Sequence, residues 1–124
     1  MKVFVTGINS LLGARLARRL LAAGHEVSGS ARTPERLPPA LQELAVVAWR
    51  LDAPPPLLAL HGVDAIVHAA YSPSPADEQR NVDGTLAMQR AAVQQGVARQ
   101  LFLSSFSATP QASSAYGRMK HTLE

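Results

Sequence analysis

The sequence predicts a doubly wound α/β domain, a parallel sheet of about five strands with helices on both of its faces. Short, continuous apolar runs alternate along the chain with longer amphipathic stretches. Continuous apolar runs are typical of strands that are buried on both faces, as they are in a parallel sheet. Regular alternation of strand and helix, with right-handed crossovers, produces the doubly wound arrangement. The length of 124 residues suits one domain.

Five apolar runs are the candidate strands, and three stretches with helical periodicity are the candidate helices. Strands are expected at 2–6, 26–31, 45–51, 64–70 and 99–105, and helices at 11–24, 75–96 and from 113 onward. Gly24 and Gly96 close the first two helices, and Ser113 or Ser114 suits the N-cap of the third. In the longest helix, Val82, Leu86 and Val93 mark the side that is expected to be buried.

Two connecting stretches are rich in proline. Residues 32–44 and 52–62 contain "TPERLPP" and "DAPPPLL". Proline fixes one backbone angle and removes an amide donor, so the first stretch is expected to form a turn and a short helix broken by prolines, and the second a poor helix that starts at its prolines. Both are interpreted as connections on the flank of the sheet, within a single domain.

Composition narrows the classes of partner. The chain has no cysteine, a net charge of +3 and four histidines without metal-ligand spacing, so neither disulfides nor a metal site is expected. The cluster Arg15, Arg18 and Arg19 fits the outer face of a helix better than a nucleic-acid surface. No apolar run is long enough for a membrane span or a signal peptide. We therefore expect a cytoplasmic protein that binds neither nucleic acid nor a membrane.

The stretch "VTGINSLLGARL" joins the first strand to the first helix. Gly7 permits a tight turn after the strand, and Gly13 lets the helix lie close to it. This turn directs the free amides of the helix N-terminus toward an anion, which is how a dinucleotide pyrophosphate is held.

The spacing of Thr-Gly, a middle residue and Gly13 resembles the TGxxGxxG loop of short-chain dehydrogenases/reductases, and within them the extended NAD(P)-dependent epimerase/dehydratase group. The resemblance implies a Rossmann-like domain whose loop binds the cofactor. The cofactor-contacting residues would be Gly7, Asn9, Ser10, Leu11, Leu12 and Gly13. Ser10 departs from the pattern, because it replaces the middle glycine. Its hydroxyl can bond a phosphate, but its Cβ takes space near the ligand.

The end of the second strand bears on the choice of nucleotide. Sites that prefer NAD usually place an acidic residue there, whereas this chain has Ala31 followed by Arg32. A guanidinium can pair with the 2′-phosphate of NADP, so NADP is favoured over NAD. The alternative is that Arg32 is an ordinary solvated loop residue.

Two later stretches also resemble the family. After the third strand, "LDAP" suggests that Asp52 and Ala53 flank the adenine ring. After the fourth, "VHAAY" suggests that Ala69, Ala70 and Tyr71 pass close to the cofactor. His68 is interpreted as a packed strand residue and not as a proton carrier.

A Tyr-x-x-x-Lys pair, Tyr116 and Lys120, lies in "SSAYGRMKHTLE", one helical turn apart. The resemblance implies that Tyr116 is the acid/base and that Lys120 is its partner and also binds the nicotinamide ribose. It further implies that Ser105 orients the substrate and that Asn81 braces the site. The chemistry suits these types: a phenol ordinarily has a pKa of about 10, and a nearby ammonium favours the phenolate. Only ten residues separate Ser105 from Tyr116, fewer than the group usually has.

Similar proteins continue beyond this pair with segments that complete the sheet and bind substrate. We therefore expect residues 1–124 to be an NAD(P)-binding domain, C-terminally incomplete, of an oxidoreductase, epimerase or dehydratase. The substrate would be a carbonyl compound or a sugar nucleotide. Any homodimer through the long helix and the Tyr–Lys helix is expected to be weak. A non-catalytic NADP-binding sensor or regulatory module is the main alternative, and a non-functional remnant is a third.

Overall fold

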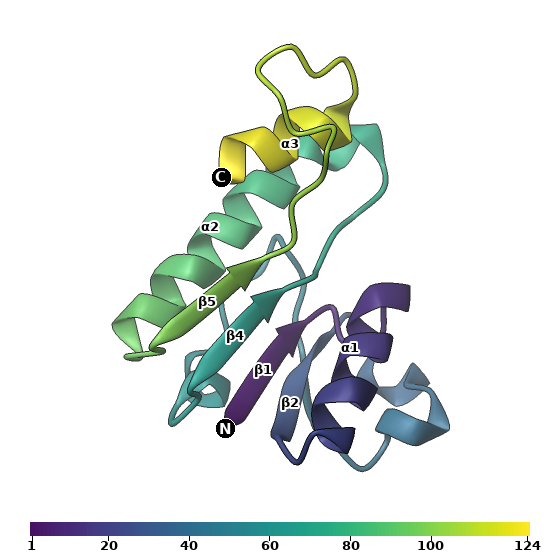
Figure 1. The fold of residues 1–124 in the computed structure, drawn as a ribbon, viewed down its shortest axis with the longest axis vertical. Coiled ribbons are helices and arrows are strands. Elements are labelled where there is room, and N and C mark those ends of the chain that lie inside the picture. The colour runs from purple at the N-terminus through teal and green to yellow at the C-terminus, as the bar shows by residue number, and fades with distance from the viewer.

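The computed structural model describes residues 1–124 and contains one parallel sheet of five strands. The strands are β1 (Lys2–Thr6), β2 (Glu26–Ala31), β3 (Ala45–Ala48), β4 (Ala65–His68) and β5 (Arg99–Phe102), in the spatial order β3-β2-β1-β4-β5. All neighbouring pairs are parallel. In Figure 1 the strands point toward the end of the molecule where the C-terminus lies. The five predicted strands and their parallel pairing are confirmed, but β3, β4 and β5 end two or three residues before the predicted ends at 51, 70 and 105.

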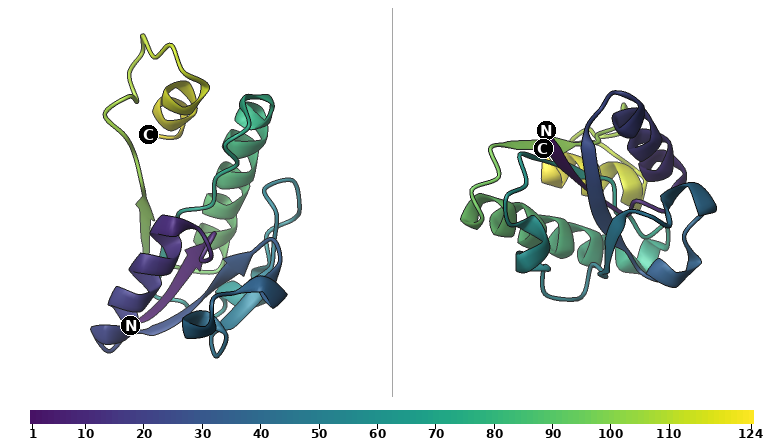
Figure 2. Two further views of the ribbon diagram at one scale, coloured as in Figure 1. Left: turned by 90° about the vertical axis from the view of Figure 1, so that its right-hand side faces the viewer. Right: turned by 90° about the horizontal axis from the view of Figure 1, so that it is seen from below.

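Three α-helices accompany the sheet: α1 (Leu11–Ala22), α2 (Glu78–Gln94) and α3 (Ala115–Leu123). Helices α1 and α2 cover opposite faces of the sheet (Figure 2). Helix α3 lies beyond the carboxyl ends of the strands, next to the start of α2 (Figures 1 and 2). None of these helices combines the length and apolar character needed to cross a membrane.

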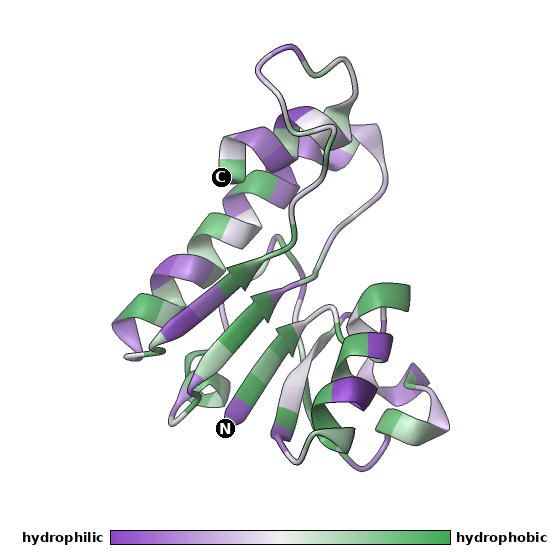
Figure 3. Cartoon of the chain, viewed as in Figure 1, coloured by the Kyte–Doolittle hydropathy of each residue, from purple (hydrophilic) through white to green (hydrophobic).

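The core has one layer on each face of the sheet. On the α1 side, Val3, Val5 and Ala17 belong to the same buried cluster. On the α2 side, Phe4 and Ile66 pack with Met88, so alternate residues of the central strands feed opposite layers. Figure 3 shows β1 and β4 as predominantly hydrophobic. Burial on both faces explains why these strands have continuous apolar sequences.

The helix ends follow their sequence signals. Gly24 and Gly96 adopt positive φ angles of 80° and 75° just after α1 and α2, as predicted for C-terminal glycines. Ser114 is the N-cap of α3, and its hydroxyl accepts a hydrogen bond from the Gly117 amide. The proline-rich connections form only 3₁₀ turns, at Pro34–Arg36, Pro39–Leu41 and Leu57–Leu60.

The predicted buried side of α2 is only partly correct. Val82 is buried and Leu86 packs beside it, but Val93 is 68% exposed. The core on this part of the helix is made by Met88, Ala91 and Ala92. A residue five positions after Met88 points well away from it around a helix of 3.6 residues per turn, so Val93 faces outward.

Helix α3 is attached to α2 by a small core and an ion pair. Met119 and Leu123 pack against Val82. The Arg118 guanidinium donates to both carboxylate oxygens of Glu78, with N–O distances of 3.0 and 2.9 Å. A two-point arginine–carboxylate contact fixes orientation as well as distance. The start of α3 is therefore held against the start of α2.

Candidate functional site

The β1–α1 turn has the conformation that its glycines predict. Gly7 has a φ of 63°, and a Cβ there would lie 2.8 Å from the Cα of Ala70. A Cβ on Gly13 would clash with the carbonyl oxygen of Gly7. Both positions exclude a side chain, the first because of the turn and the second because α1 starts close to β1. The loop therefore brings the N-terminus of α1 to the carboxyl edge of the sheet.

Ser10 is the N-cap of α1. Its hydroxyl oxygen accepts a hydrogen bond from the Gly13 amide at 3.0 Å, and its carbonyl accepts one from Ala14. The first amides of a helix have no partner within it. The Ser10 hydroxyl satisfies one of these at the start of α1, the Gly13 amide, while the amides of Leu11 and Leu12 remain available to an anion. The residue that replaces the family's middle glycine thus has a structural role.

Thr6 fixes the segment after β4, a role that the sequence analysis did not identify. Its Oγ1 atom accepts hydrogen bonds from the amides of Ala69 and Ala70, both at 3.0 Å. The side chain itself is buried. The backbone of the two alanines lies beside Gly7, and neither alanine has a side chain larger than a methyl group. The signal was a hydroxyl residue at the end of β1, the strand next to β4.

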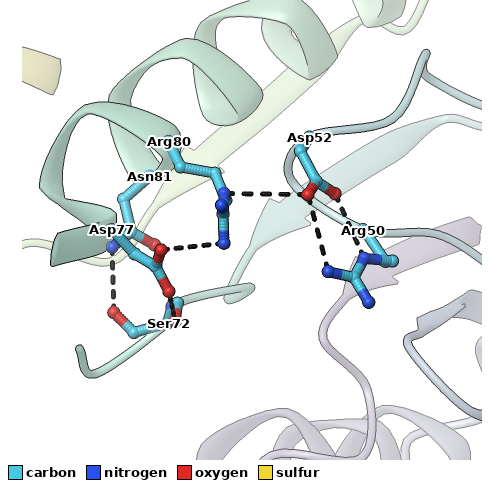
Figure 4. A network of polar contacts seen from close by, with 6 residues as sticks. All are labelled: Arg50, Asp52, Ser72, Asp77, Arg80 and Asn81. Carbon is cyan, nitrogen blue, oxygen red and sulfur yellow. Dashed lines mark hydrogen bonds and ion pairs between the residues drawn. The ribbon is translucent and has the colours of Figure 1, made fainter.

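Asn81 holds the other end of the same segment. It is buried on α2, accepts from the Ser72 amide at 2.8 Å, and donates to the Ser72 carbonyl at 2.9 Å. Both functions of the side-chain amide are used on one residue of the loop, which Figure 4 shows in part. The expected bracing position of Asn81 agrees with this geometry. Residues 69–72 are thus fixed from β1 on one side and from α2 on the other.

A first cavity of about 170 Å³ lies at the carboxyl ends of β1, β2 and β3. Its lining comprises Gly7, Asn9, Ser10, Ala31, Arg32, Trp49, Arg50, Leu51, Ala70, Tyr71 and Ser72. Arg32 is present, as the sequence analysis expected. After β3, however, the lining residues are Arg50 and Leu51, and the predicted Asp52 and Ala53 are not among them. Arg50 belongs to no family motif, and no pattern in the sequence predicts its place in this lining.

Asp52 instead belongs to a network of charges beside this cavity (Figure 4). Its carboxylate lies 3.1 Å from Arg50 Nε and 3.7 Å from Arg80 Nε. Arg80 also contacts Asp77 at 2.8 Å, and Asp77 accepts a hydrogen bond from the Ser72 hydroxyl. The hydrogen bond from Arg50 lowers the pKa of the Asp52 carboxyl. The network joins the β3 end to the start of α2.

A second cavity of about 260 Å³ lies between the start of α1 and the start of α3. Its lining comprises Ser10, Leu11, Leu12, Ala69, Tyr71, Leu103, Ser104, Tyr116 and Lys120. Ser10 and Tyr71 line both cavities. The two hollows therefore adjoin, and together they follow the carboxyl edge of the sheet.

Tyr116 and Lys120 share this second cavity. Lys120 is buried, and its Nζ atom donates a hydrogen bond to the Leu103 carbonyl at 2.5 Å. The same atom lies 5.4 Å from the centre of the Tyr116 ring and 4.5 Å from the centre of the Phe102 ring. Burial lowers the pKa of the Lys120 ammonium. Tyr71 meets Tyr116 edge to face, and burial raises the pKa of the Tyr71 phenol. The pair expected from sequence is thus brought to one place by the first turns of α3.

The serine that shares the cavity with the Tyr–Lys pair is Ser104. Ser105, the residue expected from sequence, is half-buried outside the lining of this cavity, and its hydroxyl contacts the hydroxyl and amide of Ser107 at 3.0 and 3.2 Å. Successive residues leaving a strand point to opposite sides, so a register change of one residue decides which serine faces the cavity. His68, in contrast, is packed as predicted: it is buried and contacts the Gln100 side chain at 2.9 Å.

The profile of the NAD dependent epimerase/dehydratase family matches residues 3–124. The chain therefore belongs to this family, and its five-stranded parallel sheet with helices on both faces is the Rossmann-like arrangement of related structures. The sequence-based recognition of the family is confirmed.

Three relatives show how far the similarity extends. An uncharacterized protein of Mycobacterium tuberculosis is 37% identical over 106 residues, covering 85% of this chain and 12% of that protein. A 3-beta-hydroxysteroid dehydrogenase of Mycolicibacterium neoaurum is 32% identical over 118 residues, and the match covers 86% of this chain and 32% of that protein. The structure of MoeE5 in complex with UDP-glucuronic acid and NAD has a TM-score of 0.85 at 26% identity, and the match covers 99% of this chain and 47% of the MoeE5 chain. The chain thus spans less than half the length of each.

Proposed function

We propose that this chain binds a nicotinamide dinucleotide, NADP in preference to NAD, and carries the acid/base pair of an oxidoreductase or epimerase of its family. One observation carries the proposal. Two adjoining cavities, which share Ser10 and Tyr71, extend along the carboxyl edge of the sheet. Arg32 lies in one, and Tyr116 and Lys120 lie in the other. Ligands of doubly wound domains bind outside the carboxyl ends of the strands, where these cavities are.

The residues present fit a dinucleotide. The free amides of Leu11 and Leu12 suit a pyrophosphate, and Gly7 leaves room for close approach. Arg32 would hold a 2′-phosphate at one end, and Lys120 the nicotinamide ribose at the other. Ala69 and Ala70, held by Thr6, would form the floor between them. Asp52 and Ala53 would approach the adenine only if the base extends past Arg50 and Leu51.

The chemistry of this chain's own residues is proton transfer and positioning. The bound cofactor would supply or accept a hydride. Tyr116 would give a proton to the substrate oxygen, or take one from it, through its Oη atom. Lys120, whose Nζ atom lies 5.4 Å from the centre of the Tyr116 ring, would stabilise the phenolate by its positive charge. Ser105 is proposed to orient the substrate oxygen, and Ser104 shares the cavity from the same loop.

The substrate is proposed to be a carbonyl compound or a sugar nucleotide. The two choices correspond to the relatives, one of which is a 3-beta-hydroxysteroid dehydrogenase and another of which is MoeE5 in complex with UDP-glucuronic acid. In both cases the group that reacts would be a carbonyl or hydroxyl presented to Tyr116.

The catalytic part of the proposal is tested with Tyr116→Phe. The protein is incubated with NADPH and a panel of ketones, with oxidation of the nicotinamide followed, and separately with NADP⁺ and a panel of sugar nucleotides, with conversion of the sugar followed. We expect NADPH affinity to be retained and turnover to fall about a hundredfold or more, since the proton donor is gone. His121→Gln, on the exposed side of the same helix, is the matched control. Equal turnover by wild type and Tyr116→Phe would contradict the assignment.

A non-catalytic NADP-binding module is the second candidate. The observation that favours it is the position of Ser105, which bonds to Ser107 and lies outside the cavity lining. Binding of NADPH by a protein that turns over none of the substrates, with no effect of Tyr116→Phe, would support this candidate.

A further inference from the structure

We propose that Arg50 is a second determinant of cofactor choice and that it forms, together with Arg32, a two-arginine site for the 2′-phosphate of NADP. The inference rests on the proposed function, because it concerns the same cofactor. It adds a residue outside any motif of the sequence, and it makes a separate, measurable claim about phosphate recognition.

The strand register brings the two arginines to one wall of the first cavity. Ala31 of β2 pairs with Ala48 of β3, and the Trp49 amide donates to the Ala31 carbonyl at 2.9 Å. Neighbouring strands are about 4.8 Å apart. Arg32 and Arg50 therefore leave the sheet next to each other, one residue beyond this bonded pair. Both line the same cavity.

The charge of that wall is not balanced within it. The cavity lining includes two guanidinium groups and no carboxylate. Arg32 takes part in none of the ion pairs of the chain. The one carboxylate that reaches Arg50 belongs to Asp52, and it is shared with Arg80. A net positive wall is the environment that a dianionic phosphate group requires.

The ion network orients Arg50 without using all of its donors. Arg50 contacts Asp52 through Nε at 3.1 Å and through one terminal nitrogen at 3.5 Å (Figure 4). The second terminal nitrogen makes no hydrogen bond. A guanidinium has five N–H donors in a planar fork, so Arg50 can bind a phosphate oxygen while Asp52 still holds its other edge. Asp52 is thus a positioning residue for Arg50.

The chemistry selects a phosphate monoester on the adenosine ribose. Arg32 and Arg50 follow β2 and β3, which lie at the opposite edge of the sheet from β5, whose following residues line the Tyr116 cavity. A pyrophosphate bound at the amides of Leu11 and Leu12 would already lie between the arginines and the Tyr116 cavity. The group that reaches both arginines is therefore at the opposite end of the dinucleotide from the nicotinamide, where NADP carries a phosphate and NAD a hydroxyl.

The test compares Arg50→Gln with wild type in titrations of NADPH and NADH, followed by nicotinamide fluorescence. We expect Arg50→Gln to weaken NADPH about tenfold or more and NADH by less than about twofold, since only the former loses a charge-assisted contact. Arg18→Gln, on the exposed outer face of α1, is the matched control and should change neither affinity. Arg50→Lys should be intermediate, because it keeps the charge and loses the fork.

Competition with fragments assigns the phosphate. Adenosine 2′,5′-bisphosphate should displace NADPH from wild type far better than adenosine 3′,5′-bisphosphate or AMP, and Arg50→Gln should lose that advantage. An unchanged NADPH-to-NADH ratio in Arg50→Gln would overturn the inference while leaving the proposed function intact. Equal competition by the 2′- and 3′-phosphates would overturn the assignment to the 2′ position. Failure of the folded wild type to bind either dinucleotide would overturn the proposed function, and this inference with it.

Discussion

Tyr71 and Tyr116 meet edge to face, with ring centres 5.1 Å apart and ring planes at 79°. One ring follows β4 and the other begins α3, so the contact joins the floor of the site to the helix that carries the Tyr–Lys pair. Both residues line the second cavity. The orientation of Tyr116 therefore depends on a residue of the segment that follows β4.

Replacing Tyr71 should reveal that dependence. We expect Tyr71→Ala to lower the free energy of unfolding by about 1 kcal/mol, the usual value of an aromatic pair, and Tyr71→Phe to change it much less. Urea titrations followed by circular dichroism measure both. Equal stability of the two variants would show that the ring contact contributes nothing.

Asn81 should be more sensitive, because its amide satisfies two backbone groups of Ser72. Asn81→Ala leaves a donor and an acceptor without partners, which we expect to cost about 1–3 kcal/mol of unfolding free energy and to weaken dinucleotide binding. Gln79→Ala, at an exposed position of the same helix, is the control and should cost little. A variant at Asn81 as stable as the control would contradict the bracing role.

Ser10 offers a test that separates its cap from its bulk. Ser10→Ala removes the acceptor for the Gly13 amide and should cost about 1 kcal/mol, whereas Ser10→Gly should cost only a few tenths. Because Ser10→Gly also removes the Cβ beside the loop, it should bind NADPH at least as tightly as wild type. Weaker binding by Ser10→Gly would mean that the hydroxyl itself holds the phosphate.

The Glu78–Arg118 pair should make the attachment of α3 depend on pH. The hydrogen bonds from Arg118 lower the pKa of the Glu78 carboxyl from its usual value of 4.5. A lowered folded-state pKa adds stability above the unfolded-state value, and that stability is lost as the pH falls through the folded-state value. The difference in urea midpoint between wild type and Glu78→Gln should therefore be constant above about pH 5 and shrink below pH 4.5. Glu35→Gln, which breaks no ion pair, should show no such trend.

Much of the fold could be predicted because its determinants are local. Strands β1 and β4 are continuous apolar runs, and Gly7, Gly24 and Ser114 mark turns and caps through their own backbone preferences. Val93 was predicted to be buried because it is apolar, but the helix period carries it away from Met88. Periodicity over short helix segments does not decide which of two apolar stripes faces the sheet.

The site could be predicted only where residues carry a motif. Tyr116 and Lys120 line the same cavity, as their spacing predicts, because side chains four residues apart lie on the same face of a helix. The proximity of Arg50 to Arg32 depends on the register between β2 and β3, which the sequence does not specify. The choice between Ser104 and Ser105 depends on how β5 leaves the sheet. These long-range relationships require the folded chain.

The proposed function requires a nicotinamide dinucleotide to lie along the two adjoining cavities, from Arg32 to the Tyr116–Lys120 pair and over the start of α1. Backbone amide NMR during NADPH titration of the folded chain can detect this position. We expect saturable shifts of the Leu11 and Leu12 amides and of residues near Arg32 and Tyr116, with weaker binding of NADH than of NADPH. A folded chain whose Leu11 and Leu12 amides do not respond to either dinucleotide would contradict it.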